Sequence, residues 1–142
     1  GEVAALTAGR RTGLRVVIAR PFPHTGPGQP ERFVAPAFAR RLREAARGGA
    51  TEVPTGNLDP VRELLDVRDV AAAYRLLLLH GTPGGVYNVA RGEGVRLADL
   101  FAELARRLCP GAQAVPDPAL VRPADIPHLA GDGSRLRAAT GW

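Results

Sequence analysis

Short apolar, β-branched runs alternate with longer amphipathic stretches along this sequence. The run Leu14–Ala19 is typical of a strand buried in a parallel sheet. Helical periodicity follows over residues 31–47, 67–79 and the stretch after Gly94, and shorter extended runs fall at 51–55, 62–65, 86–89 and 112–115. This order predicts an α/β fold, but the long buried strands are too few to build a complete doubly wound sheet.

Capping residues and apolar spacing define the expected helices more closely. We expect a helix over 2–11 that ends at Gly13, and a helix over 67–79 that begins at Asp66, a good N-cap residue. Each of three expected helices has an apolar face that should be buried. These faces are Val34, Phe38, Leu42 and Ala45 in the helix over 31–47; Val70, Ala71, Tyr74, Leu77 and Leu78 in the helix over 67–79; and Leu97, Leu100, Phe101, Leu104 and Leu108 in the helix after Gly94.

Amino-acid usage excludes several classes of active site. The 142 residues suit one domain, and the single cysteine, Cys109, excludes an internal disulfide and any multi-cysteine metal site, so we assign no metal ligands. All 19 basic residues are arginine, which rules out a lysine Schiff base or a P-loop lysine. Ser134, the single serine, lies outside any nucleophile-elbow pattern. The sequence holds no methionine, so we expect that Gly1 is not a translation start.

The basic charge allows two interpretations. The formal net charge is +5, and arginine-rich surfaces attract nucleic acid. Alternatively, the arginines reflect genome composition and solvate helix faces. We favour the second interpretation because acidic residues are interleaved throughout and aromatic residues make up only 5% of the chain. Apolar runs are too short to cross a bilayer and no signal peptide opens the chain, so we expect a cytoplasmic protein that binds no membrane.

A rigid loop follows the first expected strand. Residues 21–30 contain four prolines and two glycines, which predicts a loop without helix or strand. Such a loop at the end of a buried strand is where α/β proteins place ligand contacts.

Five blocks of sequence, in order, resemble the C-terminal part of the extended short-chain dehydrogenase/reductases, which include NAD-dependent sugar-nucleotide epimerases and dehydratases. Within that family the resemblance is greatest to GDP-mannose 4,6-dehydratases and GDP-4-dehydro-6-deoxy-mannose reductases. The blocks are the loop ARPFPHTGPGQ over 19–29, GNL over 56–58, DVRDVAAAY over 66–74, GVYNV over 85–89, and RPADIP over 122–127, which leads to Gly131, Asp132 and the final TGW.

The resemblance implies an α/β chain that carries the C-terminal portion of a Rossmann-type enzyme, with an incomplete parallel sheet and a small substrate-binding part. Members of the family use NAD or NADP, a Gly-rich turn and a Tyr-x-x-x-Lys pair, and the absence of lysine excludes that pair here. We therefore expect residues 1–142 to lack the N-terminal Rossmann half and to have no catalytic residue of their own. The intact enzyme would oxidise or reduce a nucleotide sugar of the GDP-mannose type at C4.

The resemblance also implies phosphate and ribose contacts. Arg62 and Arg122 match positions that contact the diphosphate, and Asp125 matches an acidic residue that accepts hydrogen bonds from ribose or base. Paired guanidinium donors suit a diphosphate. An exposed loop arginine is also ordinary solvated surface, and the residues alone leave that alternative open. Glu63 stands where the family has aspartate.

Four more residues are candidates on the same ground. His24 lies in the loop that the family places near the nicotinamide, although a hydrogen-bonded brace within the loop is the alternative. Phe33 and Val34 begin the 31–47 helix, whose N-terminus favours a diphosphate, although both also suit a plain core. Asn57 is a base contact or a left-handed turn residue. The family usually has a substrate-contacting asparagine where Pro23 stands.

Three functions remain open at this point. The first is the nucleotide-sugar-binding portion of a dehydratase or reductase, working as a homo-oligomer or with a companion N-terminal segment. The second is a non-catalytic module that binds a nucleotide or a protein, and the third is a basic nucleic-acid-binding domain.

Overall fold

The computed structural model describes residues 1–121 and 126–142, which divide into two compact units. Unit 1 comprises residues 1–24, 63–93 and 130–142, and unit 2 comprises residues 25–62 and 94–129. Each unit is assembled from segments far apart in the sequence, and each has its own apolar core.

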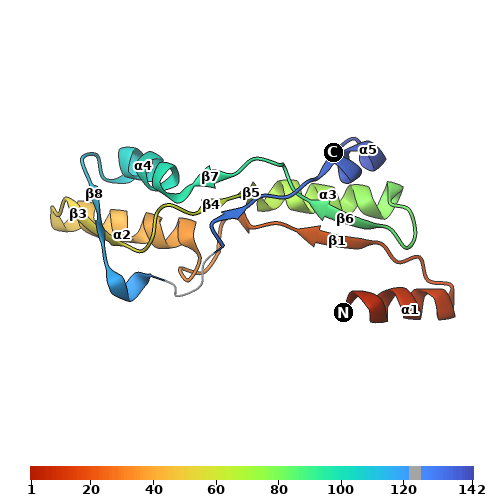
Figure 1. The fold of residues 1–142 in the computed structure, drawn as a ribbon. Helices are drawn as coiled ribbons and strands as arrows, with labels where there is room; N and C mark the ends of the chain where they lie inside the picture. Colours follow the sequence, from red (N-terminus) through yellow and green to blue (C-terminus); the bar gives the residue numbers. More distant parts are fainter. Residues whose placement is uncertain (122–125) are drawn as a thin grey trace. The chain divides into compact units, whose positions relative to one another are not determined.

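Unit 1 is built on two parallel strands. β1 (Ile18–Pro21) pairs with β6 (Val86–Val89), with Ile18 opposite Val86, and Figure 1 shows the two strands side by side. Three helices belong to this unit: α1 (Glu2–Thr12), α3 (Val67–His80) and α5 (Ser134–Thr140). The core of this unit is formed by buried side chains that come mainly from α3, β6 and α5: Leu65, Val70, Ala73, Leu77, Tyr87, Val89 and Leu136.

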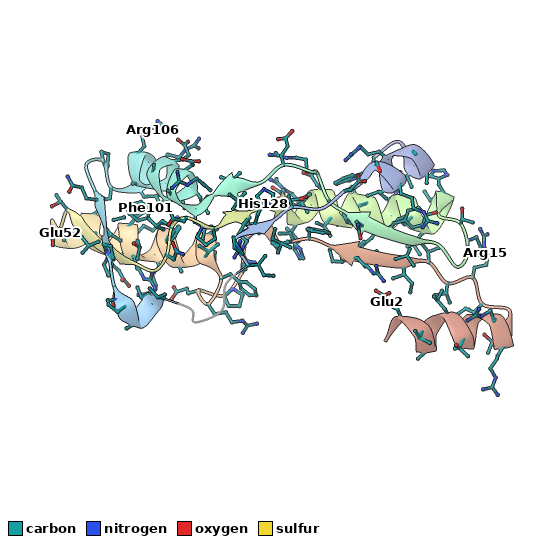
Figure 2. The ribbon with its side chains drawn as sticks, in the orientation of Figure 1. Glu2, Arg15, Glu52, Phe101, Arg106 and His128 are labelled. Atoms are coloured by element: carbon teal, nitrogen blue, oxygen red, sulfur yellow. The ribbon has the colours of Figure 1, made fainter. Side chains whose placement is uncertain are left out.

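Unit 2 packs two helices on a second parallel pair. β3 (Glu52–Thr55) pairs with β8 (Gln113–Pro116), and helices α2 (Val34–Gly48) and α4 (Leu97–Leu108) contact each other. Phe38 and Phe101 meet edge to face at 5.4 Å between ring centroids, and Figure 2 shows Phe101 within this helix pair. A 3-10 turn, η1 (Pro118–Leu120), follows β8.

A small mixed sheet completes unit 2. β4 (Val61–Arg62) lies between β7 (Val95–Arg96), which is antiparallel to it, and β9 (His128–Leu129), which is parallel to it. Two further short strands are β2 (His24–Thr25) and β5 (Leu65–Asp66).

The helix ends follow their capping residues. Gly13 ends α1 with φ +74° and Gly49 ends α2 with φ +69°, conformations that favour glycine. The Asp66 carboxylate accepts the backbone N–H of Arg68 at 2.8 Å and so caps α3. The predicted α/β class is confirmed, as are the helix stop at Gly13 and the cap at Asp66.

Several predicted boundaries were wrong. The extended run expected over 62–65 is divided into two short strands, β4 (Val61–Arg62) and β5 (Leu65–Asp66). The first strand begins at Ile18, not Leu14. Helix α2 begins at Val34, not at residue 31. In a helix that began at residue 31, Pro36 would have to donate a backbone hydrogen bond to the carbonyl of Arg32, but proline has no N–H and its ring would collide with that carbonyl. The prediction of a pure loop over 21–30 also missed β2 at His24–Thr25.

The predicted apolar face of α3 was wrong in part. Val70 and Leu77 are buried as predicted, together with Ala73, but Tyr74 is 41% exposed and Leu78 is 86% exposed. The helix turns a narrower face to the core of unit 1 than the sequence indicated. No described helix is long and apolar enough to cross a membrane.

Candidate functional site

Arg62 is carried on the central strand of the small mixed sheet in unit 2. Its backbone lies opposite Val95 on β7 and Leu129 on β9. The neighbouring Val61 N–H donates to Pro127 O at 2.8 Å, and the Arg62 Nη1 donates to Val61 O at 2.8 Å. The side chain is half-buried. Because β4 is paired on both sides, the backbone that carries this guanidinium is fixed, as an anion-binding arginine requires.

The start of α2 belongs to the same unit. Phe33 is the N-cap residue and is 43% exposed, and the Arg32 guanidinium lies 5.1 Å from its ring centroid. Within the described residues, neither a capping side chain nor an acidic residue in the first turn serves this end of the helix. The first N–H groups of α2 therefore present partial positive charge. Arg32 is a residue that the sequence interpretation did not assign.

Val34 and Asn57 have structural roles. Val34 packs against the core of unit 2. The Asn57 side-chain oxygen accepts the backbone N–H of Asp59 at 2.9 Å, which closes the turn after β3. Asn57 has a negative φ, since every positive φ among the described residues belongs to a glycine, so the left-handed interpretation of this residue was wrong. A role of either residue toward a nucleotide stays a prediction.

His24 is the last residue of the first segment of unit 1. Its Nδ1–H donates to Phe22 O at 3.0 Å, and the ring is half-buried. This contact suits the brace that the sequence analysis left open, and a contact with a cofactor stays a prediction. Arg122 and Asp125 lie outside the described residues.

A buried carboxylate was missed. Glu63 is 0% exposed, its Oε1 accepts the N–H of Arg91, and its Oε2 accepts the N–H of Gly131 at 2.8 Å. The pattern Arg62-Glu63-Leu64-Leu65 does not by itself distinguish a buried glutamate from an exposed one. The one signal was that the family has an aspartate at this position, to which the sequence analysis gave no role.

A cavity of about 630 Å³ opens beside α2 but contains none of the predicted site residues. It is lined by the loop 25–29 and by Arg40, Arg43 and Arg47. Arg40 is ion-paired with both Glu31 and Glu44, at 2.7 and 2.8 Å, so part of the positive charge is neutralised.

Ion pairs also offset much of the remaining arginine charge. Arg68 pairs with Asp66 at 2.5 Å and lowers the pKa of that carboxyl to about 2, through hydrogen bonds from its side chain and its backbone N–H. Arg106 and Arg107 both bond Glu103 and lower its pKa to about 2. Figure 2 labels Arg106 on α4. Among the described residues, no group of three or more His, Cys, Asp or Glu side chains could hold a metal ion.

A family model described as the NAD dependent epimerase/dehydratase family matches residues 1–90. The chain belongs to this family. It is 39% identical to GDP-6-deoxy-D-mannose reductase of Pseudomonas aeruginosa over 142 residues, which are 99% of this chain and 47% of the relative. The chain thus spans about half the length of the curated relative that it matches.

Solved structures show the same architecture. The RMD structure from Pseudomonas aeruginosa, complexed with NADPH, superposes with a TM-score of 0.91 at 39% identity, over 99% of this chain and 47% of that one. A putative epimerase from Burkholderia cenocepacia gives 0.84 at 34% identity, over 99% and 45%. UDP-glucose 4-epimerase from Thermotoga maritima, solved with UDP-glucose, gives 0.84 at 25% identity, over 99% and 44%. The predicted fold and family are confirmed.

Proposed function

We propose that this chain is the nucleotide-sugar-binding portion of an NAD(P)-dependent GDP-sugar reductase or 4,6-dehydratase. The observation that carries the proposal is the 39% identity to GDP-6-deoxy-D-mannose reductase, sustained over 99% of the chain. The cofactor is NAD or NADP, as in relatives solved with NADPH and with NAD. The chain holds no lysine, so the Tyr-x-x-x-Lys chemistry of the family cannot come from these residues.

The binding chemistry falls to guanidinium groups and a helix N-terminus. A nucleoside diphosphate sugar carries two adjacent phosphates, which favour paired N–H donors. Arg62 on β4 and the uncapped start of α2 are both in unit 2 and both carry positive charge. Arg122 adds a second guanidinium, and Asp125 accepts hydrogen bonds from ribose or base. Phe33 offers an exposed ring at the same end of α2.

These residues bind and orient the substrate and transfer no hydride. A nicotinamide cofactor supplies hydride transfer at C4 of the sugar. Fixing the diphosphate on rigid donors sets the position of the attached sugar, so that binding energy is used for orientation. His24 is the proposed contact of this chain with the cofactor.

Calorimetry of the chain with GDP-mannose tests the proposal. We expect Arg62→Ala to weaken binding by about 1–3 kcal/mol, the range for a hydrogen bond to a charged group. The matched control is Arg106→Ala, which removes an exposed arginine on α4 that is paired with Glu103. Equal affinity of wild type and Arg62→Ala would remove Arg62 from the site.

The same titration with UDP-glucose and a short RNA separates the alternatives. Tight binding of RNA that falls steeply with salt would favour a nucleic-acid-binding domain, and binding of none of these ligands would favour a protein-interaction module.

A further inference from the structure

Glu63 lies where the chain passes between its two units. It is the first residue of the second segment of unit 1, Arg91 is near the end of that segment, and Gly131 is the second residue of the third. The Glu63 carboxylate accepts one N–H from each of the other two residues, through separate oxygens. One buried side chain therefore holds together three points at which the chain enters or leaves unit 1.

The surrounding backbone is shaped to let these segments meet. A Cβ at Gly131 would collide with the Phe22 ring, and a Cβ at Gly133 would collide with Ala90 O. The Asn88 amide donates to Asp132 O at 3.3 Å, and Arg137 donates to Ala90 O at 3.3 Å. The two segments that the Glu63 carboxylate joins, around Arg91 and Gly131, are thus closely packed against each other.

A buried carboxylate is costly, so its role has to be specific. Among residues 1–121 and 126–142, Glu63 makes no ion pair, and the two backbone N–H groups are its hydrogen-bond donors. Removing a charge from water without pairing it disfavours folding unless strong hydrogen bonds compensate. An apolar side chain of the same size would fill the space but would leave both N–H groups without an acceptor.

We propose that Glu63 is a positioning residue that fixes the backbone carrying Arg62 and so the guanidinium that binds the diphosphate, an inference that rests on the proposed function. Arg62 is the last residue of β4 and is held by the pairing of that strand with β7 and β9. The peptide that follows it leads directly into the side chain anchored to Arg91 and Gly131. Both residues of the Arg62–Glu63 peptide are thus held, Arg62 by strand pairing and Glu63 by its carboxylate, which restricts the local backbone from which the Arg62 side chain extends.

The test uses Glu63→Gln, which keeps the size of the side chain but offers one acceptor oxygen in place of two. We expect amide hydrogen exchange to rise about tenfold at Arg91 or Gly131, since one N–H loses its acceptor. We expect GDP-mannose affinity to fall about tenfold. Glu93→Gln is the matched control because Glu93 is exposed and pairs with the Arg91 side chain, and both readouts should stay at wild-type values.

A double-mutant cycle separates positioning from general stability. In the Arg62→Ala background, Glu63→Gln should cause no further loss of affinity, because its effect passes through the missing guanidinium. Additive losses would overturn the proposal, as would unchanged exchange at both amides. If Glu63→Gln does not fold, Glu63→Asp takes its place in both measurements. Its carboxylate is one methylene further from the amides of Arg91 and Gly131, so both hydrogen bonds lengthen, and we expect faster exchange at these amides and weaker binding of GDP-mannose.

The same data distinguish the two proposals. If the wild-type chain does not bind GDP-mannose, the proposed function is overturned, and the positioning of Arg62 with it, whatever the exchange shows. If the wild type binds and the affinity of Glu63→Gln equals that of wild type, the proposed function stands and the inference about Glu63 is overturned.

Discussion

At the scale of single residues, a charge-assisted hydrogen bond stabilises the N-terminus of α3. Asp66 both caps α3 and pairs with Arg68, and these bonds lower its pKa to about 2. Because the pKa in the folded state is depressed, the contribution of Asp66 to stability is present above its unfolded pKa of about 4 and is lost as the pH falls through about 2.

Asp66→Ala tests this contact. We expect the melting temperature to drop by a few degrees at pH 7, because the N-cap and the ion pair are both removed. The difference between variant and wild type should shrink as the pH is lowered from about 4 toward 2. Thermal unfolding by circular dichroism across that range gives the result, and a gap that persists unchanged at pH 2 would contradict the assigned cause.

At the scale of elements, the sequence predicted which segments are helices and which are strands. It did not always predict where they begin and end, or which face of a helix is buried. Periodicity located α3 because its apolar residues repeat at helical spacing, but it could not tell Leu77 from Leu78, since both are leucines next to each other. Which one is buried depends on how α3 packs in unit 1, a tertiary property. The same holds for Glu63, whose burial depends on segments far away in the chain.

A pair of leucine variants measures this difference. Leu77 is 3% exposed and Leu78 is 86% exposed on the same helix. We expect Leu77→Ala to lower the free energy of unfolding by about 2–5 kcal/mol, and Leu78→Ala by less than about 0.5 kcal/mol. Urea denaturation of both variants measures these two changes in the free energy of unfolding. Equal losses would mean that the helix packs through the wider face indicated by its sequence.

At the scale of the whole molecule, unit 1 exposes several large apolar side chains. Leu14 is 69% exposed, Leu79 is 59% exposed, and β1 has β6 as its partner in a sheet of two described strands. Parallel strands are usually covered on both faces and extended by further strands.

We therefore expect the 142-residue chain to self-associate. Sedimentation velocity over a range of concentrations should show a weight-average mass above the 15.0 kDa of one chain, rising with concentration. Leu78→Ala and Leu79→Ala together should reduce that association. A single sharp monomer boundary at all concentrations would contradict the expectation.

Candidates for the site came from the resemblance alone. The resemblance selected Arg62 and the start of α2, and their role in binding stays a prediction, whereas the hydrogen bond of Asn57 to its own turn and the ring contact of Arg32 with Phe33 required coordinates. Short-range contacts of this kind depend on backbone angles that several sequences share, so pattern alone does not fix them.

In the proposed function, unit 2 binds a nucleotide sugar through Arg62 and the start of α2. A titration of the ¹⁵N-labelled chain with GDP-mannose, followed by two-dimensional NMR, tests it residue by residue. We expect saturable shifts at the amides of Phe33, Val34 and Arg62 in wild type, and we expect the shift at residue 62 to be lost in Arg62→Ala. No shifts at these amides at saturating ligand, or shifts confined to other residues, would contradict it.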